Sequence, residues 1–133
     1  MRILGVDFGG SRTGLALSDP LGITCRPLAT IEEKDEDRLV DKIVATAREE
    51  GVRQIVVGLP RPLKGGTNRQ SEAATAFKDR LERKSTIPVL MWDERFTSKL
   101  AAEGRAGRVQ DAVAACYMLQ NYLDSRANVT EDS

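Results

Sequence analysis

With 133 residues, the chain is long enough for one domain with an ordinary hydrophobic core. Apolar residues make up 41% of it and charged residues 30%, which excludes disorder throughout the chain, and no apolar run approaches the roughly 18 residues of a membrane span. The 20 basic and 20 acidic residues cancel, so the net charge gives no sign of a nucleic-acid binder. Histidine is absent, which excludes Ser-His-Asp triads, Cys-His pairs and histidine zinc sites, so any hydrolytic chemistry must use carboxylates, lysine or a bound hard cation.

Apolar runs and turn residues predict three strands and one helix in the first half of the chain. The strands are expected over Ile3–Phe8, Gly14–Ser18 and Ile23–Ile31, with a turn at Asp19–Gly22. We expect these three strands to form an antiparallel meander. A helix is predicted over Asp37–Glu50, because apolar side chains recur there at helical spacing and Gly51 can end it.

Two buried strands and two longer helices are predicted in the second half. The strands are expected over 54–59 and 88–92, and the helices over Ser71–Lys84 and Gln110–Ser125. Thr97 or Ser98 could cap a further short helix, which Gly104 and Gly107 interrupt. We expect residues 1–126 to form a single domain and residues 127–133 to be a flexible tail.

This order of elements predicts an α/β fold with a mixed five-stranded sheet. Two right-handed βαβ crossovers would add two strands parallel to the first strand, and helices would flank the sheet. In open sheets of this kind, ligand sites lie off the carboxyl ends of the parallel strands. Residues capable of chemistry are therefore expected at the ends of the predicted strands.

Carboxylates occupy the chain positions that converge at that edge. Asp7 lies near the end of the first strand, where its apolar neighbours predict burial, and an unpaired buried carboxylate costs several kcal/mol or stays protonated. Glu94 follows the last strand, and Asp111 begins the last helix. If these three meet, Mg²⁺ or Mn²⁺ relieves their repulsion, and two such ions can clamp a scissile phosphate. Because side chains alternate along a strand, Asp93 is expected on the face opposite Glu94. It would hold the metal-binding residues in place without binding the metal itself.

Each of these carboxylates also has a purely structural explanation. Asp7 could accept hydrogen bonds from backbone amides of the turn 9–13, Glu94 could pair with an arginine, and Asp111 could be a helix N-cap. Gly9 belongs to that turn, which could equally bring backbone amides to a phosphate. The residues alone leave these alternatives open.

The two cysteines predict no disulfide and no metal site. Cys25 and Cys116 are far apart in the sequence and form no CxxC pair, which argues against a disulfide framework or a zinc knuckle. Cys116 is expected to pack in the core. The N-terminus leads directly into a strand pattern without a signal peptide, so we expect a cytoplasmic protein that does not bind a membrane.

Four ordered motifs give the chain a family resemblance. D-x-G-x-x-R-x-G-x-A begins at Asp7, VGLP at Val57, DERFTS at Asp93 and D-x-x-A-A at Asp111. In this order, from the first strand to the last helix, they closely resemble the YqgF/RuvX family of bacterial RNase H-like proteins. The resemblance implies an RNase H-like fold and a metal-dependent nuclease with Asp7, Glu94 and Asp111 as its catalytic, metal-binding residues. Its cofactor would be Mg²⁺ or Mn²⁺, most simply two ions.

The resemblance also implies a nucleic-acid substrate. Two tasks are proposed for the family, maturation of the 5′ end of pre-16S rRNA and resolution of Holliday junctions. Arg12, Arg95 and Thr97 fall on family motif positions and are expected near substrate phosphate. The path from Thr97 to Asp111 is shorter than the basic loop usual in the family, so we favour precursor rRNA over branched DNA. Junction resolution would require two sites and therefore a homodimer.

Two other functions are weighed against the residues; the length argues against the first, and the second stays compatible. The stretch GVDFGGSRTGLA, residues 5–16, looks like the phosphate hairpin of actin-like and sugar-kinase ATP-binding domains. Such a nucleotide cleft needs two lobes, and 133 residues form one. A non-catalytic RNA-binding factor for ribosome assembly would also fit the zero net charge and the short loop.

Overall fold

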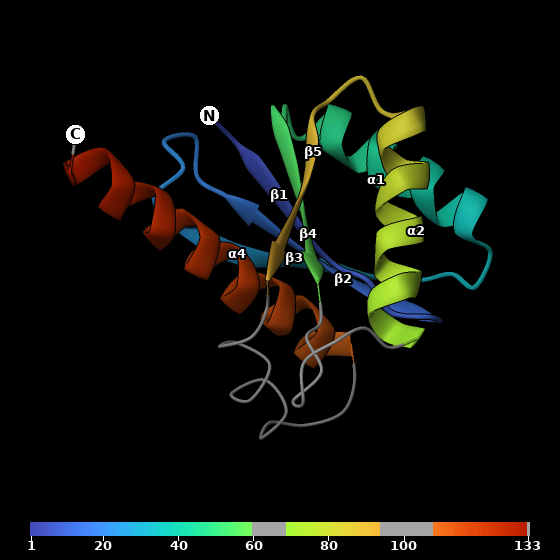
Figure 1. Cartoon of the computed structure of the whole chain (residues 1–133). Helices are drawn as coiled ribbons and strands as arrows, with labels where there is room; N and C mark the ends of the chain where they lie inside the picture. Colours follow the sequence, from blue (N-terminus) through green and yellow to red (C-terminus); the bar gives the residue numbers. More distant parts are fainter. Residues whose placement is uncertain (60–68, 94–107, 133) are drawn as a thin grey trace.

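The computed structural model describes residues 1–59, 69–93 and 108–132 (Figure 1). Its elements in chain order are β1 (Ile3–Asp7), β2 (Arg12–Ser18), β3 (Cys25–Glu32), α1 (Glu36–Glu49), β4 (Gln54–Leu59), α2 (Arg69–Lys84), β5 (Val89–Asp93) and α4 (Arg108–Asp132). The strands form one sheet in the order β3-β2-β1-β4-β5. β1 and β3 are antiparallel to β2, while β4 is parallel to both β1 and β5. The predicted mixed sheet is confirmed.

The last helix differs most from its prediction. α4 continues to Asp132, past the predicted end at Ser125, so its backbone is helical through most of the predicted tail. The reason is that no glycine or proline stands between Arg126 and Asp132 to stop the helix. The short helix predicted after Thr97 lies outside the described residues. No described helix, α4 included, is long and apolar enough to cross a membrane.

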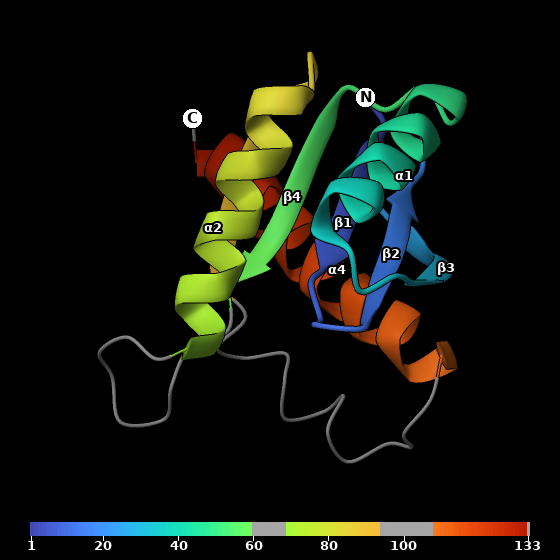
Figure 2. The same ribbon diagram turned by 90° about the vertical axis from the view of Figure 1, so that its right-hand side faces the viewer.

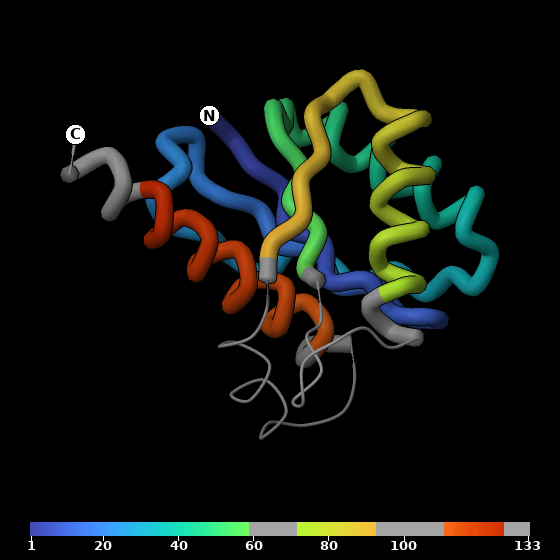
Figure 3. Tube along the Cα trace, in the orientation of Figure 1, coloured from blue at the N-terminus to red at the C-terminus, as the bar shows by residue number. Residues whose placement is uncertain are grey.

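Helices cover both faces of the sheet (Figure 2). α1 and α2 pack on one face, where Leu39, Ile43 and Phe77 are fully buried among the strand side chains. α4 packs on the other face through Ala115 and Leu119. The Cα trace shows the same arrangement, with α4 across the strands from α1 and α2 (Figure 3). The sheet is therefore the middle of three layers.

Side chains of β1 alternate between the two helical layers. Val6 is buried in the core under α1 and α2, whereas Ile3 is buried in the core under α4. A Cβ at Gly5 would lie 2.9 Å from the Cβ of Leu119 in α4. Because strand side chains alternate with a period of two, Asp7 shares the α4 face with Ile3 and Gly5.

The fold also brings the two cysteines together, which their distance along the chain does not indicate. Cys25 and Cys116 are 91 positions apart, yet their sulfur atoms are 3.3 Å from each other. The reason is that the start of β3 packs on the middle of α4, which spacing along the chain does not reveal. Both side chains are half-buried, and neither forms a disulfide.

A side chain, not the backbone, accepts the first hydrogen bond of β1. Ile3 donates its N–H to Ser18 Oγ at 2.8 Å, and Ser18 Oγ donates to the carbonyl of Asp19 at 3.0 Å. Both Ile3 and Ser18 are buried. Ser18 therefore fixes the start of the strand that ends in Asp7.

Replacing this hydroxyl tests its role. Ser18→Ala is expected to lower the free energy of unfolding by about 1–3 kcal/mol, because the buried N–H of Ile3 loses its acceptor. Urea unfolding followed by circular dichroism measures the change. Ser11→Ala, at an exposed position, is the control and should change stability by less than about 0.5 kcal/mol. Equal stability of the two variants would contradict this account.

Candidate active site

The carboxyl ends of three parallel strands lie at one edge of the sheet. Val6 of β1 pairs with Val57 of β4, and Leu59 of β4 pairs with Asp93 of β5. Asp7 ends β1 at this edge, and Asp93 ends β5. Only β4 lies between these two strands, so they are about 10 Å apart at the usual strand spacing. The candidate site occupies this edge.

An aromatic stack holds the chain directly after Asp7. Phe8 stacks on Phe77 of α2, with ring centroids 4.3 Å apart and an interplanar angle of 14°. Val6 and Phe8 both belong to the layer under α1 and α2, on the face opposite Asp7. Asp7 itself is only partly buried. The apolar neighbours of Asp7 in the sequence therefore do not surround its carboxylate in space.

The first turn of α4 meets the sheet at Gly14. A Cβ at Gly14 would overlap the backbone carbonyl of Asp111 and lie 2.9 Å from the backbone N of Ala112. Gly14 is also the register partner of Asp7 in the β1–β2 pair. Opposite residues in an antiparallel pair have Cα atoms about 5 Å apart. Asp7 and Asp111 are thus brought close to each other by their shared neighbour Gly14.

Asp111 forms an ion pair with Arg12 through an oxygen that accepts no hydrogen bond from the described residues. Arg12 Nε lies 3.1 Å from Asp111 Oδ2, with 41% of the arginine side chain and 27% of the aspartate side chain exposed. Solvent screens a pair this exposed, so it contributes little stability. Oδ2 is nevertheless buried, and it has no hydrogen-bond partner among the described residues. Oδ2 is therefore the oxygen that faces Arg12, and it keeps lone-pair capacity because the 3.1 Å contact is an ion pair without hydrogen-bond geometry.

Thr13 closes the turn between β1 and β2. Its Oγ1 accepts a hydrogen bond from the N–H of Gly9 at 3.4 Å and donates one to the carbonyl of Gly9 at 3.3 Å. A Cβ at Gly9 would overlap the carbonyl of Arg12, whereas a Cβ at Gly10 would meet nothing within 4 Å. Thr13, which is 1% exposed, was not among the predicted site residues. The available signal was a polar residue at a strand position that faces the core.

The end of β5 is fixed against α4. The Trp92 and Tyr122 rings meet edge to face, with centroids 5.3 Å apart, and Trp92 Nε1 donates to Asn121 Oδ1 at 3.1 Å. β5 ends at Asp93, the next residue. The strand end that precedes Glu94 is thereby anchored to the same helix that contains Asp111.

Three predicted site residues, Glu94, Arg95 and Thr97, lie outside the described residues. Of the predicted acidic trio, Asp7 and Asp111 both have their backbones next to Gly14, while their metal-binding role and the place of Glu94 stay predictions. Within the described ranges, which leave out Glu94, no group of three cysteine or carboxylate side chains could hold a metal ion.

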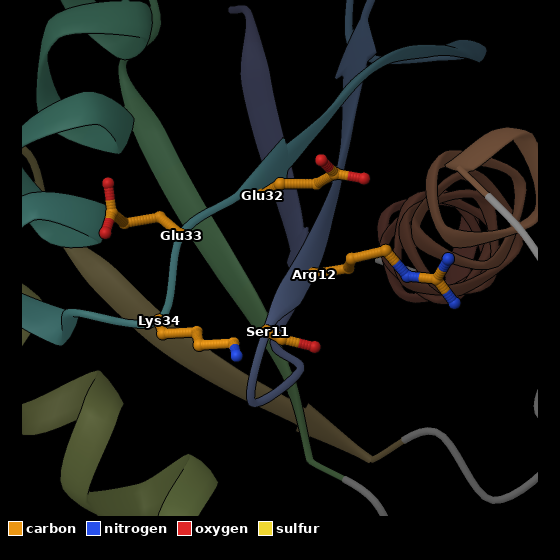
Figure 4. Close-up of a pocket in the computed structure, with 5 residues that line it drawn as sticks. All are labelled: Ser11, Arg12, Glu32, Glu33 and Lys34. Atoms are coloured by element: carbon orange, nitrogen blue, oxygen red, sulfur yellow. The ribbon is translucent and has the colours of Figure 1, made fainter.

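A pocket of about 520 Å³ opens beside the turn, and its lining consists of Ser11, Arg12, Glu32, Glu33 and Lys34 (Figure 4). Figure 4 shows Arg12 extending toward α4. Glu33 accepts a hydrogen bond from Lys42 Nζ at 2.9 Å, which lowers the pKa of Glu33 below its usual value. Two basic side chains line the pocket, Arg12 and Lys34. Arg12 pairs with Asp111, whereas Lys34 makes no ion pair within the described part of the chain. A positive side chain is therefore available next to the candidate site.

Comparison with known proteins identifies the family. A family model described as "RuvX: Holliday junction resolvase" matches residues 1–125. The chain belongs to the RuvX family. Its relatives include proteins of Clostridium kluyveri and Clostridium acetobutylicum, each named "Putative pre-16S rRNA nuclease". The first is 40% identical over 93% of this chain and 97% of its own length, and the second is 37% identical over 94% and 99%.

Solved structures confirm the RNase H-like fold of this RuvX family member. Thermus thermophilus RuvC in complex with a Holliday junction substrate matches with a TM-score of 0.64 and 13% identity, over 96% of each chain. The fowlpox virus resolvase in complex with Holliday junction DNA matches with a TM-score of 0.61 and 12% identity, over 95% of this chain and 99% of that one. At such identities the likeness concerns the fold alone.

The contact at Gly14 is testable with a matched glycine. Gly14→Ala is expected to destabilise the chain by about 1–3 kcal/mol, because the new methyl group overlaps backbone atoms of Asp111 that cannot move aside as a side chain could. Thermal and urea unfolding measure this. Gly10→Ala, where a Cβ has open space, should be close to neutral. Wild-type stability of Gly14→Ala would show that α4 does not approach β2 so closely.

Proposed function

We propose that this chain is a divalent-metal-dependent nuclease that hydrolyses phosphodiester bonds in structured nucleic acid. The main support is that the backbones of Asp7 and Asp111 both lie next to Gly14, where a buried Asp111 oxygen faces Arg12 and accepts no hydrogen bond from the described residues. Carboxylate oxygens are preferred ligands of Mg²⁺ and Mn²⁺. The relatives are named as pre-16S rRNA nucleases and the family model as a Holliday junction resolvase, and both names denote enzymes that act on nucleic acid.

Asp7 and Asp111 would hold the metal, with Glu94 as a third ligand from the segment after β5. Bound Mg²⁺ or Mn²⁺, as a pair, supplies an activated water and stabilisation of the leaving oxygen. Arg12 orients the Asp111 carboxylate through their ion pair. The N-terminal turn of α4 adds partial positive charge at the same place, which favours both a carboxylate and a substrate phosphate.

Other residues would bind the substrate or support the ligands. Arg12, Arg95 and Thr97 are proposed to contact phosphate groups of the nucleic acid, as their motif positions suggest. Gly9 would keep the turn after Asp7 tight, in agreement with the overlap that a Cβ there would cause. Asp93 would support the strand end next to Glu94.

Precursor rRNA is the proposed substrate, with 5′-end processing of pre-16S rRNA as the task. The support is that relatives 40% and 37% identical over nearly their whole lengths are named for pre-16S rRNA. Holliday junction cleavage is the second candidate, because the family model is described by it. Paired cuts across a junction require two sites and therefore a homodimer. Parallel digestion of a pre-16S leader and a synthetic four-way junction separates the two.

The proposed role of the Asp7 carboxylate as a metal ligand is tested by an isosteric substitution. Asp7→Asn is expected to lower cleavage of either substrate on the order of 100-fold or more, since even residues that only orient metal ligands contribute 10–100-fold. Cleavage rates are measured in Mg²⁺, in Mn²⁺ and with a chelator. Asp79→Asn is the matched control and should keep full activity. Asp79 is exposed on α2, which packs on the face of the sheet opposite α4.

Two results would overturn the proposal. Undiminished cleavage by folded Asp7→Asn would remove Asp7 from the chemistry. Tight RNA binding without turnover in either metal, equal for wild type and Asp7→Asn, would instead identify a non-catalytic assembly factor. Circular dichroism of each variant establishes that the fold is intact.

The phosphate role of Arg12 predicts a change in salt dependence. Arg12→Ala should weaken binding of the RNA leader, measured in chelator so that no cleavage occurs. It should also reduce the slope of log affinity against log salt concentration by about 0.7–0.9, the amount expected for one lost phosphate contact. Arg53→Ala, next to the amino-terminal end of β4 and thus at the opposite edge, should leave the slope unchanged. An unchanged slope in Arg12→Ala would restrict Arg12 to its pair with Asp111.

A further inference from the structure

Two thiols meet where the start of β3 crosses the middle of α4. Cys25 is the first residue of β3, and its Sγ lies 3.3 Å from Sγ of Cys116. Cys25 Sγ also lies 3.2 Å from the carbonyl oxygen of Cys116, to which it donates. Both side chains are partly exposed, so a small oxidant can reach them. They are the only cysteines of the chain.

A glutamine holds this crossing together. Gln120, one turn after Cys116, donates its side-chain N–H₂ to the carbonyl of Ile23 at 3.0 Å and to Asp124 Oδ1 at 3.0 Å. Its Oε1 lies 3.6 Å from Cys25 Sγ, within hydrogen-bond reach of a thiol. These contacts fix the chain entering β3 against α4. The closeness of the two sulfurs is therefore a property of packed elements on both sides.

We propose that Cys25 and Cys116 form an intramolecular disulfide when the protein meets a hydroperoxide, and that this reversible bond links β3 to α4. A disulfide needs an S–S distance of about 2.05 Å, so the sulfurs must approach by little more than 1 Å. Rotation about the Cα–Cβ bonds of the two side chains moves the sulfurs over distances of this order. The structure thus contains the reduced form of a preorganised pair.

The reaction proceeds in two balanced steps. The sulfur of Cys116 attacks one oxygen of the hydroperoxide, the O–O bond breaks, and Cys116 sulfenic acid and one molecule of alcohol or water result. The sulfur of Cys25 then attacks the sulfenic sulfur, the S–O bond breaks, and water leaves with the thiol proton. Two thiols lose two electrons in total, and the peroxide gains two.

The environments of the two thiols favour this order. Burial, together with the hydrogen bond to Cys116 and the nearby Asp124 carboxylate, raises the pKa of Cys25 well above that of an ordinary thiol. Cys25 therefore stays protonated and reacts second, once an electrophilic sulfur is within contact distance. Cys116 is left as the thiol that meets the oxidant.

The bond would stabilise the fold without distorting the candidate active site. It closes a chain segment between positions 91 apart, which strongly restricts the unfolded state. Cys116 lies on the same helix as Asp111, but the sulfurs already touch, so α4 need not shift. The expected result of oxidation is therefore higher thermal stability.

The test uses the full-length, reduced protein and hydrogen peroxide at about one equivalent. Intact mass spectrometry under denaturing conditions should show a monomer lighter by two hydrogen atoms, and dithiothreitol should restore the original mass. The melting temperature of the oxidised monomer should rise by about 5–15 °C. No substrate or metal is needed, so the result does not depend on the proposed nuclease function.

Two matched variants assign the order of reaction. Cys25→Ser leaves Cys116 without its partner and should accumulate a sulfenic acid that dimedone traps. Cys116→Ser should react with peroxide at least several-fold more slowly, because only the protonated Cys25 remains. A covalent dimer of the wild type, direct oxidation to sulfinic acid, or an unchanged mass and melting temperature would each overturn the proposal.

Discussion

The structure depends on the close approach of α4 to β2 at Gly14. Only a residue without a side chain lets the first turn of the helix touch the strand, because any Cβ there overlaps the backbone of Asp111. The same glycine pairs with Asp7 in the sheet. One steric condition therefore brings the backbones of Asp7 and Asp111, 104 positions apart in the chain, to the same glycine. Without this approach, Asp111 would be an ordinary acidic residue at a helix start.

The alternation of β1 side chains between the two faces of the sheet explains why a carboxylate is tolerated within an apolar strand. The residues on either side of Asp7 turn to the layer under α1 and α2, where Phe8 stacks on Phe77. Asp7 turns to the opposite face and is only partly buried. The large cost of an isolated buried charge does not arise, because the burial suggested by the flanking residues belongs to the other side of the sheet.

The sequence predicted the elements and the sheet order well, because apolar periodicity and short connections determine both. It also indicated that Asp7, at the end of a parallel strand, and Asp111, at the start of the last helix, lie near each other, and both backbones lie next to Gly14, while their binding of a metal stays a prediction. The ion pair between Arg12 and Asp111 was not predicted, because it depends on the register between β1 and β2 and on where α4 crosses. The contact of Cys25 with Cys116 was missed for the same reason: a helix crossing is fixed by packing, which spacing along the chain does not encode.

The candidate site lies at the edge formed by the carboxyl ends of the parallel strands, and the helices on both faces of the sheet hold residues at this edge. The layer under α1 and α2 holds the chain on either side of Asp7 through Val6 and Phe8. α4 supplies Asp111, and through Tyr122 it also holds Trp92 at the end of β5. Geometry at the edge therefore depends on packing in both layers. One helix, α4, contains Asp111, Cys116 and Tyr122, so the cysteine crossing and the candidate site are built on the same packed element.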